Sequence, residues 1–244
     1  MTIIESFIEE YQRNLSAYEI AREQAEKTIK QLVNDEGILA IVSSRVKDPD
    51  RLKEKLRDRN FKSRYSSFDD IIADIPDFIG ARIALYFPTD KDRIKNLLAR
   101  DFVIEKVKTF PGEQRKYEGY ERRFSGYCAT HYRVRFKTPT KSILKNPLIE
   151  IQVASLLMHA WSEVEHDLAY KTMKGEVSFD EYESLDEING LVIAGEISLQ
   201  RLQRLSQARI ESGEKTITDH YQLSAYLLEK YTRLPRNAMC ILEM

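Results

Sequence analysis

Residues that form disulfides and bind structural metals are scarce in this sequence. Two cysteines, Cys128 and Cys240, and four histidines occur in 244 residues. Two cysteines so far apart do not build a disulfide framework or complete a four-ligand zinc site. We therefore expect a fold held by its hydrophobic core, which a chain of this length is long enough to bury.

Long apolar runs and an excess of either charge are also missing. Lys and Arg number 38 against 39 Asp and Glu, for a formal net charge of -1, so total charge gives no attraction to nucleic acid or membrane. The apolar runs fall far short of the roughly 20 residues that span a bilayer. The stretch MTIIESFIEEYQ lacks a signal peptide's basic start and apolar core. We expect a soluble, cytoplasmic protein without a membrane partner, in which any basic site is local.

Helical and strand-like segments alternate along the chain. Helices are expected over residues 2–33, 48–59 and 89–101, from Leu156 onward, around 188–206, and over 217–231. Strands are expected over residues 37–46, 78–87, 102–110, 127–138 and 147–155, with a loop over 111–126. This order predicts an α+β fold with a mixed sheet. Its parts are an N-terminal helix (1–34), a core (35–175) and a C-terminal helical extension (176–244).

Two stretches place charged residues beside predicted strands. In SSRVKDPDRLKEK, Arg45, Lys47 and Lys55 form a basic cluster of a kind that binds phosphates; a solvated helix face is the alternative. In DIPDFIGAR, Asp77 precedes an apolar strand that contains Arg82. A carboxylate there suits magnesium, and an arginine there needs an anion. The alternative is that Asp77 caps a turn and Arg82 pairs with a local acid.

Two later stretches combine aromatic, acidic and imidazole groups. The stretch ERRFSGYCATHYRV contains Arg123, Tyr127 and His131. A strand would place Tyr127 and His131 on one face, about 13 Å apart. The tyrosine ring could then stack on a nucleotide base. Core packing is the alternative. In IEIQVAS, Glu150 shares a strand face with Gln152. The next helix carries His159, Glu163 and His166, which lack zincin spacing and are expected to support the site and a helix interface.

In this order, the four stretches resemble the synthetase domain of the RelA/SpoT family, most closely its small alarmone synthetases. The resemblance covers residues 38 to 172. It lies in the basic strand-to-helix motif, DFIGAR, GYCATHY, and EIQVAS with the helix HAWSEVEHDLAYK. It implies a nucleotidyltransferase-like fold and Mg²⁺-dependent transfer of pyrophosphate from ATP to the 3'-hydroxyl of GDP or GTP.

The resemblance also implies roles for individual residues. Asp77 and Glu150 would be catalytic and bind magnesium, with Glu150 near the acceptor hydroxyl as general base or through the metal. The remaining roles are ATP binding for Arg45, Lys47, Lys55 and Arg82, and acceptor binding for Arg123, Tyr127 and His131. No counterpart of the family's hydrolase domain is present in the sequence.

The sequence departs from the family pattern on the acceptor side. The pattern's Arg-Ser after Gly-Tyr is here Cys128 and Ala129, and its Arg-Thr after Glu-x-Gln is Ala154 and Ser155. This leaves open an adenosine acceptor, the 3' end of tRNA, and a catalytically inactive nucleotide sensor.

Apolar stripes at both ends of the chain indicate self-association. One contains Phe7, Tyr11, Leu15 and Tyr18, and the other contains Ile188, Leu191, Val192, Leu199 and Leu202. We expect a homo-oligomer, as in small synthetases of the family; packing of these helices within one chain is the alternative.

Overall fold

A computed structural model describes residues 2–111, 120–138, 144, 146–170, 177–211 and 219–231. The chain divides into two compact units between Ile197 and Ser198. The first unit contains the sheet, and the second contains helix α8 (His220–Tyr231). Within the described ranges, no helix is long and apolar enough to cross a membrane.

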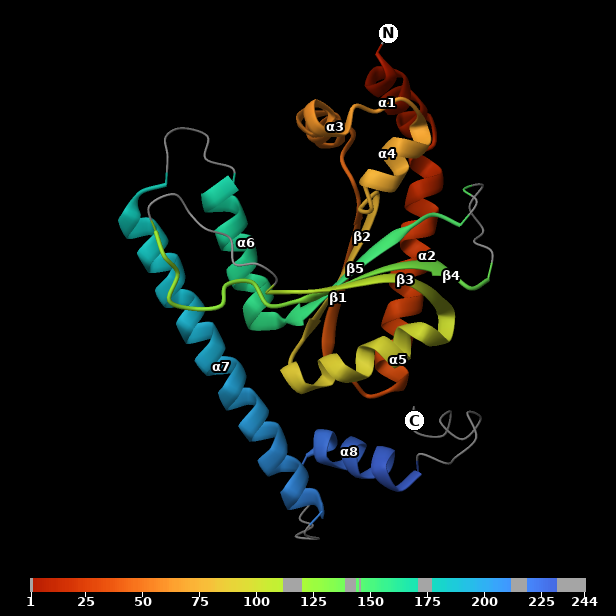
Figure 1. Ribbon diagram of the computed structural model, residues 1–244. Coiled ribbons are helices and arrows are strands. Elements are labelled where there is room, and N and C mark those ends of the chain that lie inside the picture. The colour runs from red at the N-terminus through yellow and green to blue at the C-terminus, as the bar shows by residue number, and fades with distance from the viewer. Residues whose placement is uncertain are drawn as a thin grey trace. The chain divides into compact units, whose positions relative to one another are not determined.

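A five-stranded mixed sheet forms the centre of the first unit (Figure 1). Its strands are β1 (Ala40–Val46), β2 (Ile79–Leu85), β3 (Phe102–Thr109), β4 (Thr130–Phe136) and β5 (Ile149–Ser155). They lie in the order β1-β2-β5-β4-β3. The β2–β5 pair is parallel and the other pairs are antiparallel. The predicted α+β class with a mixed sheet is confirmed.

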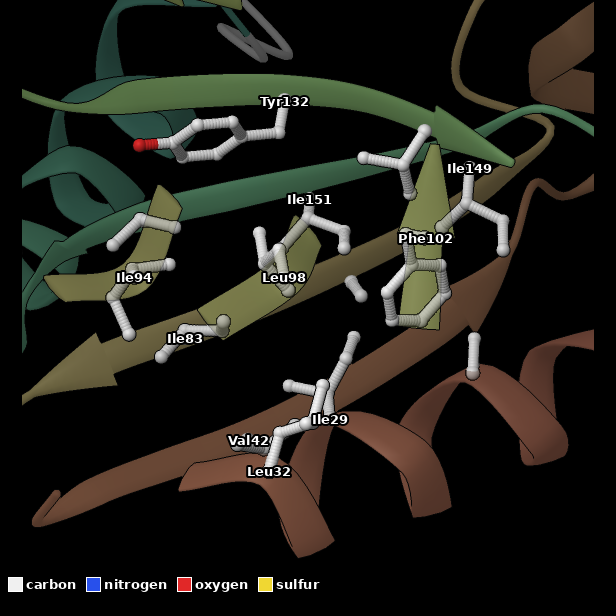
Figure 2. Packing of buried hydrophobic residues seen from close by; sticks show 14 of the residues in the cluster. Ile29, Leu32, Val42, Ile83, Ile94, Leu98, Phe102, Tyr132, Ile149 and Ile151 are labelled. Atoms are coloured by element: carbon white, nitrogen blue, oxygen red, sulfur yellow. The ribbon is translucent and has the colours of Figure 1, made fainter. Parts of the chain in front are cut away.

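One face of this sheet is covered by α2 (Leu15–Asp35) and α5 (Lys91–Asp101), which follows the short 3-10 helix η1 (Pro88–Asp90). Alternate strand residues such as Ile83 and Ile151 pack against Ile29 of α2 and Leu98 of α5 (Figure 2). Because side chains alternate between the faces of a strand, the residues between these apolar positions point to the opposite face. That face carries the candidate site.

The N-terminal segment forms two helices rather than the single helix predicted over residues 2–33. α1 (Ile3–Arg13) ends at Asn14, and α2 begins at Leu15. α1 packs on α3 (Pro49–Ser63) and α4 (Phe68–Asp74) through Phe7, Leu52 and Leu56. The predicted start of α3 is confirmed, because Asp48 caps it and Pro49 is its first residue. The short α4 was not predicted.

The next helices are α6 (Leu156–Tyr170) and α7 (Phe179–Glu211), of which α7 belongs to the first unit only up to Ile197. Within that unit the two helices run side by side (Figure 1). The apolar stripe predicted on α7 is largely exposed, since Ile188 is 45% and Leu191 is 73% exposed. The buried residues of α7 are Leu185, Asp186 and Asn189. Helical periodicity thus identified the helix but not the side that packs.

Candidate functional site

The strand register brings the charged stretches together on the face opposite α2 and α5. Gly80 of β2 pairs with both Arg45 of β1 and Glu150 of β5. One step along, Gln152 of β5 pairs with both Arg82 and His131. Groups that are far apart in sequence therefore form two adjacent rows across one sheet face.

A pocket of about 180 Å³ opens on this face. Its lining includes Arg45, Lys47, Asp77, Arg82 and Gln152, together with Ser43, Ser44, Val46, Asp48, Arg51, Gly80 and Ala81. Arg51 was not singled out from the sequence. Its sequence position could have identified it, because Arg51 lies four residues before Lys55 on α3 and the two therefore share one helix face.

Two lysines hold Asp77 at the entrance of β2. Lys47 Nζ donates to Asp77 Oδ2 at 2.6 Å, and Lys55 Nζ donates to Oδ1 at 3.1 Å. Burial raises the pKa of the Asp77 carboxyl, but the two ammonium groups outweigh this and leave the pKa below its ordinary value. Burial also lowers the pKa of Lys47, against the opposing effect of Asp77. The carboxylate is therefore ionised at neutral pH beside two cations.

This lowered pKa predicts how the stability depends on pH. The pKa of the Asp77 carboxyl is lower in the folded protein than its ordinary value of 3.8, which applies to the unfolded chain. Such a group stabilises the fold at pH values above 3.8, and this stabilisation is lost as the pH falls through the folded pKa. Asp77→Asn should cost about 1–3 kcal/mol of unfolding free energy at pH 6, and the gap to wild type should close below pH 3.8. Urea denaturation across this range measures the gap. An unchanged gap at low pH would contradict the assignment.

Arg82 is held by an acid from α6. Its Nη2 lies 2.7 Å from Glu163 Oε1, and its Nε donates to Gln152 Oε1 at 3.4 Å. The acid partner considered for Arg82 from the sequence is thus Glu163. Burial, then the charge of Arg82, lowers the pKa of the neighbouring His159. The expected supporting role of α6 fits these contacts, whereas His166 is exposed beside Asp167.

Glu150 and the aromatic pair lie together on the acceptor side. Tyr127 Oη and His131 Nε2 share a hydrogen bond of 3.1 Å, and His131 Nδ1 lies 3.8 Å from Glu150 Oε1. The sequence-based separation of about 13 Å was wrong for these side chains, because β4 begins only at Thr130. Burial raises the pKa of the Tyr127 hydroxyl to about 12, so this hydroxyl stays protonated.

The Glu150 carboxylate is ionised and oriented. Burial raises the pKa of Glu150, but the neighbouring His131 ring and the hydrogen bond from Gln152 together outweigh burial and leave this pKa below its ordinary value. Gln152 Nε2 donates to Glu150 Oε2 at 3.3 Å. The negative charge of Asp77 also acts on Glu150, which places the two carboxylates in one electrostatic site.

Arg123 is placed differently from the other predicted acceptor residues. Its exposed guanidinium pairs with Glu183 of α7, and its main-chain N–H donates to Asp186 at 2.7 Å. The side chain of the preceding Arg122 is 10% exposed and pairs with Glu165 of α6. The structure thus brings Tyr127, His131 and Glu150 together and places the Arg123 guanidinium beside α7.

The positions that depart from the family pattern also lie together. Ala129 and Ala154 form a buried apolar cluster with Met158 and Trp161, against which Cys128 packs. Ser155 Oγ donates to Glu196 of α7. Small residues just before β4 and at the end of β5 thus pack with Trp161 where the pattern has larger, polar ones.

The donor set fits magnesium. Mg²⁺ prefers one or two carboxylates and completes its octahedral shell with phosphate oxygens and water. Asp77 lines the pocket, and Glu150 of β5 pairs in register with the pocket residue Gly80, so two such groups are available. Over the part of the chain that the structure describes, no three acidic, histidine or cysteine side chains form a metal-binding group. This arrangement suits an ion that arrives with a nucleotide.

More than half of the chain matches a known protein family. The region found in RelA / SpoT proteins matches residues 44–175. GTP pyrophosphokinase YjbM of Bacillus subtilis (strain 168) is 29% identical over 147 residues, which make up 59% of this chain and 63% of that protein. The matched part is therefore just under two thirds of that relative's length.

Two solved structures share the fold. Small alarmone synthetase 1 from Bacillus subtilis, bound to its product pppGpp, has a TM-score of 0.61 and 26% identity, covering 82% of this chain and 99% of that one. A GTP pyrophosphokinase family protein from Streptococcus pneumoniae has a TM-score of 0.66 and 21% identity, covering 85% of this chain and 97% of that one.

Proposed function

The chain belongs to the RelA/SpoT family, and we propose that it transfers pyrophosphate from ATP to the 3'-hydroxyl of GDP or GTP to make ppGpp or pppGpp. The observation that carries this proposal is the convergence of Asp77 with its lysines and of Glu150 with His131 on one sheet face. We place the enzyme in the cytoplasm, where both nucleotides occur.

The donor site would act by exchanging ion-pair partners. Without nucleotide, Asp77 neutralises Lys47 and Lys55, and Glu163 neutralises Arg82. A triphosphate offers these cations new anionic partners, with Arg45 and Arg51 on the same pocket wall. Asp77 and Glu150 would then hold Mg²⁺, whose charge would stabilise the negative charge that develops during transfer.

The acceptor site would orient the attacking hydroxyl. In the proposed reaction, the 3'-oxygen bonds to the β-phosphorus of ATP, the bond from that phosphorus to the α-phosphate oxygen breaks, and AMP leaves. Glu150 accepts the hydroxyl proton, while Gln152 and His131 hold its carboxylate in place. Positioning and charge neutralisation supply most of the catalysis in such transfers.

Thin-layer chromatography of products from labelled ATP tests the acceptor. The purified protein is incubated separately with GMP, GDP, GTP, ADP and bulk tRNA. We expect label to move to GDP and GTP. Label on ADP or tRNA instead would replace the proposed acceptor, and no transfer to any of the five would contradict enzymatic activity.

Tyr127→Ala tests the acceptor side. Loss of a base-stacking platform costs roughly 1–3 kcal/mol, which corresponds to an increase of about 5- to 150-fold in the acceptor KM. The KM for ATP should change little, because Tyr127 contacts Phe110 and His131 rather than the lysines. Steady-state kinetics with each substrate varied in turn measures the two values. An unchanged acceptor KM would return Tyr127 to a packing role.

We further propose that the chain forms a homo-oligomer through α7. Leu191 and Ile197 are 73% and 61% exposed, whereas the N-terminal residues Phe7 and Tyr11 are covered by the chain's own core. Light scattering should give a multiple of 28.5 kDa, and Leu191→Asp should lower that mass. A wild-type mass of 28.5 kDa, unchanged by nucleotide, would contradict self-association.

A further inference from the structure

Two buried polar side chains of α7 bind the main chain that leads to Tyr127. Asp186 is 4% exposed and Asn189 is 0% exposed. Asp186 accepts hydrogen bonds from the N–H groups of Arg123 at 2.7 Å and Phe124 at 3.3 Å, and from Tyr120 Oη at 3.1 Å. Asn189 accepts from the N–H of Gly126 at 3.0 Å and donates to its carbonyl at 3.3 Å.

These bonds satisfy main-chain groups of a segment that lies outside the sheet. Residues 121–129 precede β4 and lie outside the sheet ladder. Buried main-chain N–H and C=O groups need hydrogen-bond partners, and α7 supplies them through side chains three residues apart on one helix face. An apolar pair at the same positions would pack but could not fix the direction of this segment.

Two glycines allow the close approach that these bonds require. A Cβ on Gly190 of α7 would lie 2.5 Å from the ring of Phe124. Gly126 has φ +71°, in the left-handed region that favours glycine, which permits the turn whose main-chain groups bind Asn189. The helix and the segment therefore fit each other at a short distance.

We propose that Asp186 and Asn189 are positioning residues for the acceptor nucleotide. They fix the main chain up to Gly126, so that the next residue, Tyr127, presents its ring and its bond to His131 in one arrangement. Trp161 Nε1 donates to the carbonyl of Leu185 at 2.9 Å, which ties the same turn of α7 to α6. The inference rests on the proposed function in assigning the acceptor to Tyr127.

Binding measurements on Asn189→Ala test this role. Isothermal titration calorimetry gives the Kd of GTP and, separately, of the non-hydrolysable ATP analogue AMPCPP. We expect the Kd of GTP to rise by about tenfold or more, as for loss of an ordered stacking platform. The Kd of AMPCPP should stay within about twofold, because the lysines of its site pair with Asp77 at the start of β2.

Two further variants separate positioning from loss of stability. Leu98→Ala removes a buried side chain of α5 on the far face of the sheet, and its two Kd values should both stay near those of wild type. Asp186→Asn keeps the shape and one acceptor oxygen, so it should weaken GTP binding less than Asp186→Ala does. If Asn189→Ala does not fold, the comparison of Asp186→Asn with Asp186→Ala tests the positioning role instead.

A Kd for GTP within about twofold of wild type in Asn189→Ala, or in Asp186→Ala where the former is unfolded, would overturn the inference. An equal rise in both Kd values would overturn it as well, because it would show a general effect on the fold. A wild-type protein that binds GTP but transfers nothing would contradict the proposed function. The change in Kd from wild type to variant, measured for GTP and for AMPCPP, would still decide the role of α7.

Discussion

Replacement of Glu150 with glutamine is expected to reduce transfer by about 10²- to 10⁴-fold, the usual contribution of a positioned general base. Glutamine has the same volume and can still contact Gln152 and His131 but cannot take up the hydroxyl proton. The structure gives Glu150 an ionised carboxylate, fixed at 3.3 Å from Gln152 Nε2. We expect the KM values for both nucleotides to change much less than kcat.

Glu105→Gln is the matched control for this prediction. Glu105 pairs with Arg135 at the exposed edge of the sheet, so its replacement should leave transfer within about twofold of wild type. Single-turnover kinetics with saturating nucleotides measures the chemical step for both variants. Activity of Glu150→Gln within about tenfold of wild type would remove Glu150 from the mechanism, since general bases contribute more than that.

Asp77→Asn is expected to lower transfer by at least about a hundredfold, comparable to loss of one preorganised electrostatic group. The change leaves Lys47 and Lys55 without their carboxylate, and it removes one of the two proposed magnesium ligands. It should therefore raise the KM for ATP, which Glu150→Gln should change much less, and it should increase the concentration of Mg²⁺ needed for half-maximal rate.

Asp74→Asn serves as the control for Asp77→Asn. Asp74 also pairs with a basic residue, Arg59, and accepts from Tyr65, but it does not line the pocket. Its replacement should affect stability without changing the KM for ATP. If Asp77→Asn retained a wild-type rate and an unchanged magnesium requirement, the donor site would be assigned to the wrong residues.

The sequence predicted the parts of the site that depend on strand periodicity. Alternation in β5 put Glu150 and Gln152 on one face, and the register then placed Arg82 of β2 beside Gln152. The cap at Asp48 was predictable because it depends only on neighbouring residues. Local rules succeed where neighbours determine the conformation.

Features that depend on contacts between distant segments were not predictable in this way. Apolar spacing marks an exposed stripe on α7, whereas the side that packs carries Asp186 and Asn189, whose partners lie more than sixty residues earlier. The pairing of Arg123 with Glu183 was not predictable for the same reason, because these two residues are also far apart in sequence. The convergence of Tyr127 on His131 depends on a main chain that leaves the extended conformation before β4.

Phosphorus-31 NMR of a reaction with ATP and GTP tests the central claim most directly. The proposed transfer predicts AMP and a guanosine nucleotide with a diphosphate on its 3'-oxygen, formed in equal amounts. Glu150→Gln should form both at least about a hundredfold more slowly. ADP in place of AMP, or a guanosine nucleotide without a new phosphorus resonance at the 3' position, would contradict pyrophosphate transfer by this site.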